Sequence, residues 1–265
     1  MAMGTKGRAG PFFSALLLLI ATSISIGRIA RADGKTSEGS VSLEGSTLRY
    51  EGLITDASNQ RLRELYESSD PRPSVLRIRS FGGEINAGMD LGNFVFDREL
   101  VVEVFEYCFS SCANYVVTAA RSLRLEPTAV LGWHGGATQK IDPQTVSVTV
   151  DGKELQGAER RAQLTRLALE KMMRSNIERE TAFFERVGVD PRITVLGQTD
   201  FYRERYTEAQ KYSGWYFSLE DLRRLGVRPV TVIGDGEWQP GELPGGYKVF
   251  RVPLEATPDR PSAAE

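Results

Sequence analysis

The sequence predicts an α/β fold in which a mostly parallel sheet is flanked by helices. Residues 75–79, 101–107 and 129–133 have the composition of buried strands, because they are rich in β-branched, aliphatic or aromatic side chains. Helical patterns separate them, at 85–96, where apolar residues share one helical face, and at 113–120. Strands that alternate with helices are typical of a parallel sheet with crossover helices.

The first 32 residues have the three-part pattern of a secretory signal peptide. Lys6 and Arg8 form a basic start, residues 12–26 are apolar, and a small-x-small site ends at Ala32. We therefore expect cleavage near Ala32 and export to the periplasm or the cell exterior. Retention of the segment as a membrane anchor is the alternative, although it is short for a transmembrane span.

The charge balance after cleavage argues against one class of partner. Of the 33 basic residues 29 would remain, against 35 acidic ones, so the net charge would be −6 with a neutral histidine. An acidic chain without a basic block gives no reason to expect nucleic acid as a partner. A membrane partner is expected only if residues 1–32 are retained.

The rest of the chain divides into a lead-in, one domain and a tail. Residues 33–46 are polar and contain Gly and Ser, so they are expected to form a flexible lead-in. The domain is expected to span 47–234, beginning with an edge strand at 47–54 and a helix at 58–67. Residues 235–265 are expected to form the tail.

Three further elements are expected in the second half. Residues 145–150 alternate in polarity and end at Asp151-Gly152, which predicts a hairpin. Residues 158–187 predict a long helix with an apolar stripe and charged, solvated faces. The tail contains a strand at 247–252, and its end from residue 257 is expected to be disordered.

Two serines stand where the strand at 101–107 gives way to the helix at 113–120. A hydroxyl at Ser110 or Ser111 would lie among unpaired helix N–H groups at the positive end of the helix dipole. This setting suits a nucleophile or a bound anion. A simple helix cap is the alternative interpretation.

Two other motifs also follow strand ends, where parallel sheets bind ligands. Gly82-Gly83 follows the strand at 75–79, and paired glycines allow a sharp turn with open N–H groups. His134, the only histidine, follows the strand at 129–133, and a packed structural role is its alternative. A glycine cradle, a serine at a helix start and a histidine are the parts of an acyl-transfer site.

Together these motifs resemble the proteolytic subunit of Clp protease, within the Clp/crotonase superfamily. The resemblance runs from about residue 48 to 232. It is carried by Gly82-Gly83-x-Ile-x-Ala-Gly-Met, by Ser111 and His134, by Arg124-Leu125-x-Pro127 and by residues 215–227. It implies a sheet built from repeated ββα units, a homo-oligomer with contacts through the helix at 158–187, and a peptide or unfolded protein as substrate. No cofactor is implied.

The resemblance also assigns roles to single residues. It implies Ser111 as nucleophile and His134 as general base, with the backbone N–H groups of Gly83 and Cys112 as the oxyanion hole. If the alignment is shifted by one residue, Ser110 takes the place of the nucleophile. A serine needs both a base for its proton and preorganised donors for the oxyanion.

The third catalytic residue departs from the family pattern. The family's aspartate falls on Ser213 or Gly214, and neither is acidic. Asp200, Glu204 and Glu208 lie upstream, and no spacing selects among them. The site is therefore a Ser–His dyad, a triad with a relocated acid, or inactive.

Cys108 and Cys112 are the only cysteines, and they bracket the serines. In an oxidising compartment they can form a disulfide, provided that Cys108 is extended and Cys112 opens the helix. Two buried thiols are the alternative. Two cysteines are too few for a metal site, and no histidine or acid stands at zinc-finger spacing, so no metal is expected.

The leading functional hypothesis is an exported serine peptidase. An acyl-CoA hydratase or isomerase of the same superfamily is disfavoured, because coenzyme A is not expected outside the cytoplasm. The non-enzymatic alternative is a catalytically inactive, oligomeric binding scaffold, and the missing aspartate is its main support.

Overall fold

The computed structural model describes residues 39–138, 149–150, 153–168, 172–206, 212–234 and 236–254. The predicted signal segment, Glu208 and the end of the tail therefore lie outside the described residues. Within these ranges, no helix combines the length and the apolar composition needed to cross a membrane.

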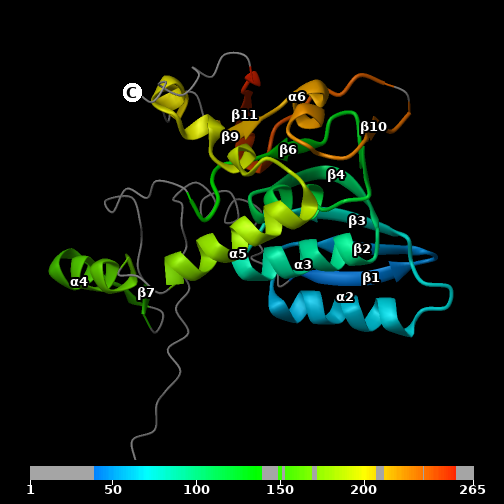
Figure 1. Cartoon of the computed structure of the whole chain (residues 1–265), viewed down its shortest axis with the longest axis horizontal. Coiled ribbons are helices and arrows are strands. Elements are labelled where there is room, and N and C mark those ends of the chain that lie inside the picture. The colour runs from blue at the N-terminus through cyan, green and yellow to red at the C-terminus, as the bar shows by residue number, and fades with distance from the viewer. Residues whose placement is uncertain are drawn as a thin grey trace, which may run out of the picture.

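The described residues form a seven-stranded main sheet, which confirms the predicted α/β class (Figure 1). The pair of β1 and β2 is antiparallel, and the other five strand pairs of this sheet are parallel. In spatial order the strands are β1 (Ser40–Glu44), β2 (Thr47–Glu51), β3 (Val75–Ser80), β4 (Val101–Phe109), β5 (Ser122–Leu125) and β10 (Val230–Val232), and β6 (Val130–Gly132) pairs with the end of β4.

Each central strand has one apolar and one charged face. In β3, Leu76 and Ile78 are buried, while Arg77 and Arg79 are half-buried on the other side. The two arginines pair with glutamates of neighbouring strands and lie over the ring of Phe105. The apolar face carries the helices, and the charged face is satisfied by its own ion pairs.

Three helices cover the apolar side: α2 (Asp56–Ser68), α3 (Ile85–Asp97) and α5 (Met172–Val187). In Figure 1, α2 and α3 lie side by side along the sheet and α5 crosses α3. A Cβ atom at Gly92 of α3 would lie 2.6 Å from the carbonyl oxygen of Tyr115 and 2.9 Å from the ring of Phe183. These close approaches require a small residue there and bring α3 and α5 against the segment after the serines.

The remaining elements surround the end of the main sheet. A parallel pair, β9 (Tyr212–Tyr216) and β11 (Lys248–Arg251), lies beside α6 (Leu219–Arg224) in Figure 1. A hairpin of β7 (Thr149–Val150) and β8 (Lys153–Glu154) precedes α4 (Gly157–Ala168). Short 3₁₀-helices are η2 (Pro191–Thr194), η3 (Leu196–Gln198), η4 (Asp200–Tyr206) and η5 (Pro244–Gly246).

The prediction of a flexible lead-in is wrong for residues 40–44. These form β1, which pairs with β2 through a turn at Gly45, so β2 is not the edge strand that the sequence predicts. The physical reason is the alternation of Val41 and Leu43 with polar residues, a strand pattern that the surrounding Gly and Ser residues obscure.

The predicted tail is also part of the fold as far as its described residues extend. The predicted strand at 247–252 is present as β11, and its partner β9 places Val249, Phe250 and Val252 in buried positions. The long helix predicted at 158–187 is described as α4 and α5, and residues 169–171 between them lie outside the described residues. The predicted hairpin is present in its described part, Thr149–Glu154 in register.

Candidate active site

The serines lie at a sharp turn between a strand and a helix. β4 ends at Phe109, Ser110 has a φ of 59°, and the π-helix η1 (Cys112–Val117) follows Ser111. A non-glycine residue in this left-handed region costs roughly 1–2 kcal/mol. Such strain, and π-helical turns, concentrate at functional sites. The predicted helix at 113–120 is thus a short π-helix. Ser110, which precedes Ser111 at its start, is held in an unfavourable backbone conformation.

The pairing of β4 with β6 brings His134 to this turn. Phe109 lies opposite Gly132 in the parallel register, and the N–H group of Ser110 donates to the carbonyl oxygen of Gly132 at 3.1 Å. A Cβ atom at Gly132 would lie 2.6 Å from the ring of Phe109, so only glycine fits. The next residue but one, His134, therefore emerges beside Ser110 at the same sheet edge.

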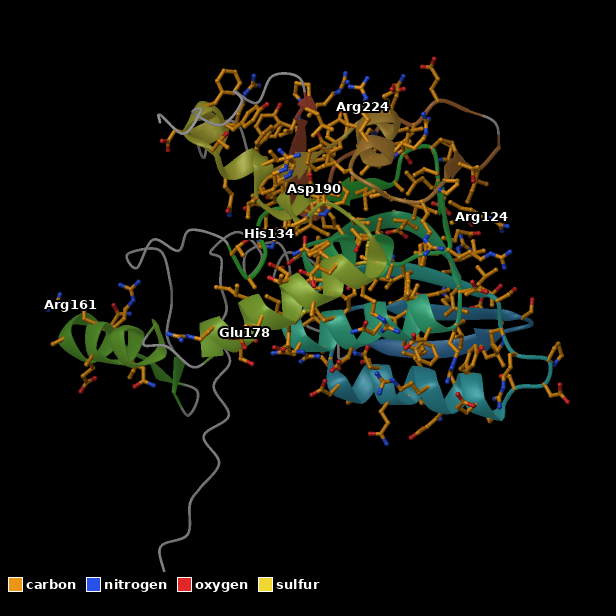
Figure 2. The ribbon with its side chains drawn as sticks, viewed as in Figure 1. Arg124, His134, Arg161, Glu178, Asp190 and Arg224 are labelled. Atoms are coloured by element: carbon orange, nitrogen blue, oxygen red, sulfur yellow. A yellow bond between two sulfur atoms is a disulfide. The ribbon has the colours of Figure 1, made fainter. Side chains whose placement is uncertain are left out.

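The imidazole of His134 contacts Ser110 directly. Its Nε2 atom lies 2.7 Å from Oγ of Ser110, and its ring stacks on Phe109 with centroids 5.2 Å apart and planes 10° apart. Gln198 donates to the carbonyl oxygen of His134 at 2.8 Å, which fixes the backbone. In Figure 2 His134 lies between α5 and the β9–β11 sheet.

This geometry corrects the register of the predicted site by one residue. The sequence resemblance pairs His134 with Ser111, but the Ser111 hydroxyl instead donates to the carbonyl oxygen of Gly83 at 3.0 Å. The reason is local, because Ser111 already has helical dihedral angles, with φ −56°, whereas Ser110 occupies the turn itself. Ser110, the alternative in the sequence analysis, is the serine that meets the histidine.

The glycine loop lies against the two serines. Gly82 has a φ of 89°, and a Cβ atom there would lie 2.7 Å from the nitrogen of Ser111 and 2.8 Å from Cβ of Ser110. The Gly82 N–H group donates to Ser80 Oγ, while Gly83 is exposed. In the described part of the chain, the loop and turn hydrogen bonds use neither the Gly83 nor the Ser111 N–H group. Both are therefore candidate donors to an acceptor, Gly83 at an exposed position and Ser111 at a buried one.

Cys112, the second predicted oxyanion donor, lies one residue further into the helix than this pairing requires. If Ser110 is the reacting serine, the N–H group of the following residue is that of Ser111. Gly83 remains the other candidate donor. The shift of one residue therefore moves the donor pair from Gly83 and Cys112 to Gly83 and Ser111.

Burial sets the electrostatics of the histidine. Removal from solvent lowers the pKa of His134 to about 4, and an interaction with its own backbone offsets this only in part. Desolvation disfavours the charged imidazolium form. The imidazole is therefore neutral at pH 7 and can accept a proton.

The position of the missing acid is closed by packing. Trp133 and Trp215 exchange both backbone hydrogen bonds, at 2.9 and 2.8 Å, which puts Gly214 opposite His134. A Cβ atom at Gly214 would lie 2.1 Å from the carbonyl oxygen of Trp133, so no carboxylate fits there without a backbone shift. Ser213 is buried, and its hydroxyl has no hydrogen-bond partner among the described residues.

The upstream acids do not supply a described partner. Asp200 is an exposed residue of η4. The side chain of Glu204 and the whole of Glu208 lie outside the described residues. Among the described residues, the ring of His134 makes one hydrogen bond, to Ser110. The described site is a Ser–His dyad.

Cys108 and Cys112 form a disulfide, with Cα atoms 5.3 Å apart. Both residues are fully buried. The bridge that the sequence predicts thus closes a small ring around the two serines. It joins the end of strand β4 to the start of η1 and restricts the backbone at Ser110.

Two buried side chains near the site were not predicted. Asn114 of η1 donates to the carbonyl oxygen of Gly135 at 2.7 Å, and Glu180 of α5 accepts from the N–H group of Ala137. Both hold the loop after His134. A sequence signal exists for Glu180 alone, because it is an acid within the apolar stripe of its helix, but the stripe gives no hint of what it contacts.

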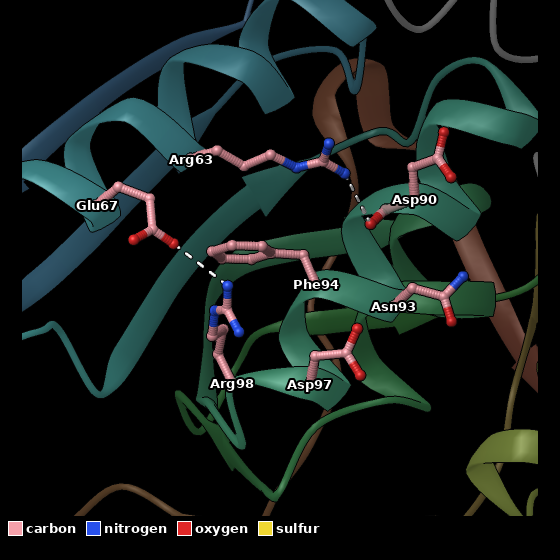
Figure 3. Close-up of a pocket in the computed structure, with 7 residues that line it drawn as sticks. All are labelled: Arg63, Glu67, Asp90, Asn93, Phe94, Asp97 and Arg98. Carbon is pink, nitrogen blue, oxygen red and sulfur yellow. Dashed lines mark hydrogen bonds and ion pairs between the residues drawn. The ribbon is translucent and has the colours of Figure 1, made fainter.

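No described cluster of three or more His, Cys, Asp or Glu residues could hold a metal ion. A surface pocket of about 340 Å³ lies between α2 and α3, and no residue of the Ser–His site lines it. Figure 3 shows that charged side chains of both signs surround the ring of Phe94 there, among them Arg98 and Glu67, which form an ion pair of 3.2 Å.

Comparison with known proteins gives little similarity. No protein-family model and no curated protein matches this sequence. Among solved structures, a protein assigned as an enoyl-CoA hydratase/isomerase of Novosphingobium aromaticivorans matches with a TM-score of 0.27 and 12% sequence identity. The match covers 35% of this chain and spans 46%, about half, of the other. The fold class above therefore rests on this chain's own sheet topology.

Proposed function

We propose that this protein is an exported serine peptidase that cleaves peptide bonds with Ser110 as nucleophile and His134 as general base. The observation that carries the proposal is the 2.7 Å contact between His134 Nε2 and Ser110 Oγ, made at a strained turn between a strand and a helix. The sequence resemblance to the proteolytic subunit of Clp protease supports the choice of a peptide as substrate.

The geometry supports a two-step acyl transfer. As Ser110 Oγ attacks the carbonyl carbon of the substrate, its proton passes to Nε2 of His134. The oxyanion that forms accepts hydrogen bonds from the N–H groups of Gly83 and Ser111. The imidazolium then protonates the leaving amine nitrogen, and the C–N bond breaks to leave an acyl-enzyme. Water attacks this ester, gives a proton to His134, and the proton returns to Ser110 as the acid product leaves.

A dyad is expected to be slower than a full triad. In a Ser-His-Asp enzyme, replacement of the aspartate lowers kcat by about 10⁴-fold, mainly because the wrong imidazole tautomer is favoured. Here the stacking on Phe109 and the bond from Gln198 hold the ring and its backbone instead. Burial keeps the imidazole neutral at pH 7, and no carboxylate among the described residues hydrogen-bonds to it to stabilise the imidazolium that the first step forms.

The oxidised cysteine pair supports export, because structural disulfides persist mainly in oxidising compartments. Together with the signal-peptide pattern, it motivates a mature chain that begins at Asp33. Measurement of the intact mass of the exported product tests this. Recovery of the full chain from the cytoplasm, with residues 1–32 attached, contradicts it. A homo-oligomer is part of the proposal, and sedimentation of the mature protein tests it.

Labelling by a fluorophosphonate tests the activity. The purified mature protein should be modified covalently at Ser110, as mapped by peptide mass spectrometry. Ser110→Ala should abolish labelling, and His134→Ala should reduce its rate by at least about 10²-fold, because an unassisted hydroxyl is a weak nucleophile. A folded wild-type protein that resists the probe would instead favour the inactive binding scaffold.

A further inference from the structure

Glu180 is a buried carboxylate that joins the two halves of the candidate site. It lies in α5 with 2% of its surface exposed. The hydroxyl of Tyr115 donates to its Oε1 atom at 2.7 Å, and the N–H group of Ala137 donates to both of its oxygens at 3.0 Å. One side chain thus binds the helix after Ser110 and the loop after His134.

The carboxylate of Glu180 is closely packed against the loop after His134. A Cβ atom at Gly136 would lie 2.6 Å from Oε1 of Glu180 and 2.7 Å from Oγ1 of Thr194. The backbone between His134 and Ala137 is therefore pressed against the carboxylate and cannot move toward α5. Asn114 also holds this loop, because its side-chain N–H₂ group donates to the carbonyl oxygen of Gly135 at 2.7 Å.

A purely packing role does not require an acid at this place. Among the described residues, the groups that contact Glu180 are a hydroxyl and backbone N–H groups, and none is a cation. Burial raises the pKa of Glu180, and the donors of Ala137, Tyr115 and Thr138 oppose that rise. The phenol group of Tyr115, whose pKa is raised by burial and by this carboxylate, is the titratable partner. Burial of a carboxylate costs free energy unless it accepts hydrogen bonds, and once it accepts several of them it holds their donors rigidly.

We propose that Glu180 is a positioning residue, which fixes the distance between Ser110 and His134 by holding Tyr115 and Ala137 at one point. It does not touch the reacting atoms. Its effect on reaction rate rests on the proposed function, but its hold on His134 does not. Because Ala137 lies three residues after His134, we expect that release of this loop exposes the imidazole to solvent.

The single histidine allows a direct test by NMR. With ¹⁵N-labelled histidine, the imidazole signals of the folded wild-type protein report one titration, that of His134. In Glu180→Gln, an amide N–H₂ group replaces one of the two oxygens that accept from the N–H group of Ala137 and repels that group, so the loop is held less tightly. The midpoint should then move upward toward the solvent value near 6.5 by at least about one pH unit. Loss of the negative charge without release would lower the midpoint or leave it unchanged, so the direction of the shift separates the two effects.

The labelling rate gives the second readout. Under the proposal, Glu180→Gln should react with the fluorophosphonate at least roughly tenfold more slowly at a temperature where it is fully folded, because small misplacements of reacting groups cost this much. Glu178→Gln is the matched control, since Glu178 is exposed on the same helix, and it should keep both wild-type values. Figure 2 shows Glu178 on α5.

Tyr115→Phe is a second variant that tests the same proposal if Glu180→Gln does not fold. It removes one hydrogen bond and retains the ring contacts with Phe183 and Phe184. A smaller shift in the same two readouts is expected. Unchanged titration and labelling in a folded Glu180→Gln protein would overturn the proposal, even if its melting temperature falls. If the wild-type protein never labels, the proposed function fails, while the titration still decides the role of Glu180.

Discussion

The hydroxyl of Ser111 donates to the carbonyl oxygen of Gly83 at 3.0 Å. This bond ties the serine turn to the glycine loop and leaves the neighbouring Ser110 free to meet His134. The Ser111 hydroxyl thus binds within the fold, whereas the Ser110 hydroxyl contacts the imidazole.

Substitution of each serine separates these roles. Ser110→Ala should abolish fluorophosphonate labelling, while Ser111→Ala should keep labelling at Ser110 and lower the free energy of unfolding by about 1 kcal/mol, the usual loss for one hydrogen bond. Chemical denaturation and peptide mapping measure the two effects. Labelling that survives in Ser110→Ala and disappears in Ser111→Ala would restore the register predicted from the sequence.

The rate of labelling should have an unusually acidic dependence on pH. The pKa of His134 is lowered by burial to about 4, so the imidazole stays neutral and able to accept a proton down to that pH. We expect the rate to fall with a midpoint near pH 4 as the imidazole becomes protonated. A midpoint near 6.5, measured on protein shown to be folded by circular dichroism, would show that the ring is solvated.

The same pKa predicts a change in stability with pH. The folded-state pKa, about 4, lies below the unfolded value near 6.5, so between these values the unfolded chain binds a proton that the folded chain does not. The contribution of His134 to stability is therefore lost as pH falls from about 6.5 to 4. Urea denaturation of wild type and His134→Gln should converge over this window. Curves that stay parallel would contradict the shift.

The disulfide should stabilise the serine turn locally. For a ring as small as the one between Cys108 and Cys112, the loop-entropy relation gives about 2 kcal/mol. We expect the Cys108→Ala/Cys112→Ala variant to lose about this much unfolding free energy and to label more slowly. Non-reducing mass spectrometry of the exported wild type should show the loss of two hydrogens. Two thiols that alkylate freely in native protein would contradict the bridge.

Gly82 should tolerate no side chain. At a φ of 89°, a Cβ atom would meet the backbone of Phe109 and Ser111 at 2.8 and 2.7 Å. Because of backbone strain and this steric clash, Gly82→Ala should lower the free energy of unfolding by about 3 kcal/mol and abolish labelling. Gly45→Ala is the matched control, since Gly45 also has a positive φ but nothing within 4 Å of its Cβ position. Equal melting temperatures for the two variants would show that crowding is unimportant.

Much of the fold could be predicted from local sequence patterns. Strands β3, β4 and β6 and helix α3 follow from apolar periodicity, which records burial directly because each element turns one side to the core. Strand β1 was missed because Gly and Ser residues obscure its alternation. Strand β5 was missed as well, and it is only four residues long, too short for a periodic signal.

The sequence by itself determined which segments meet at the edge of the sheet, because parallel strands end on the same side and Gly82, Ser110, Ser111 and His134 all follow strand ends. Only the tertiary structure decided which serine faces the histidine, since adjacent residues of a turn point in different directions and a pattern does not fix φ. It also decided the role of Glu180, whose partners Tyr115 and Ala137 lie 65 and 43 residues away in the chain. Contacts between residues so distant in the chain follow from the packing of α5 against α3 and η1, which no local pattern encodes.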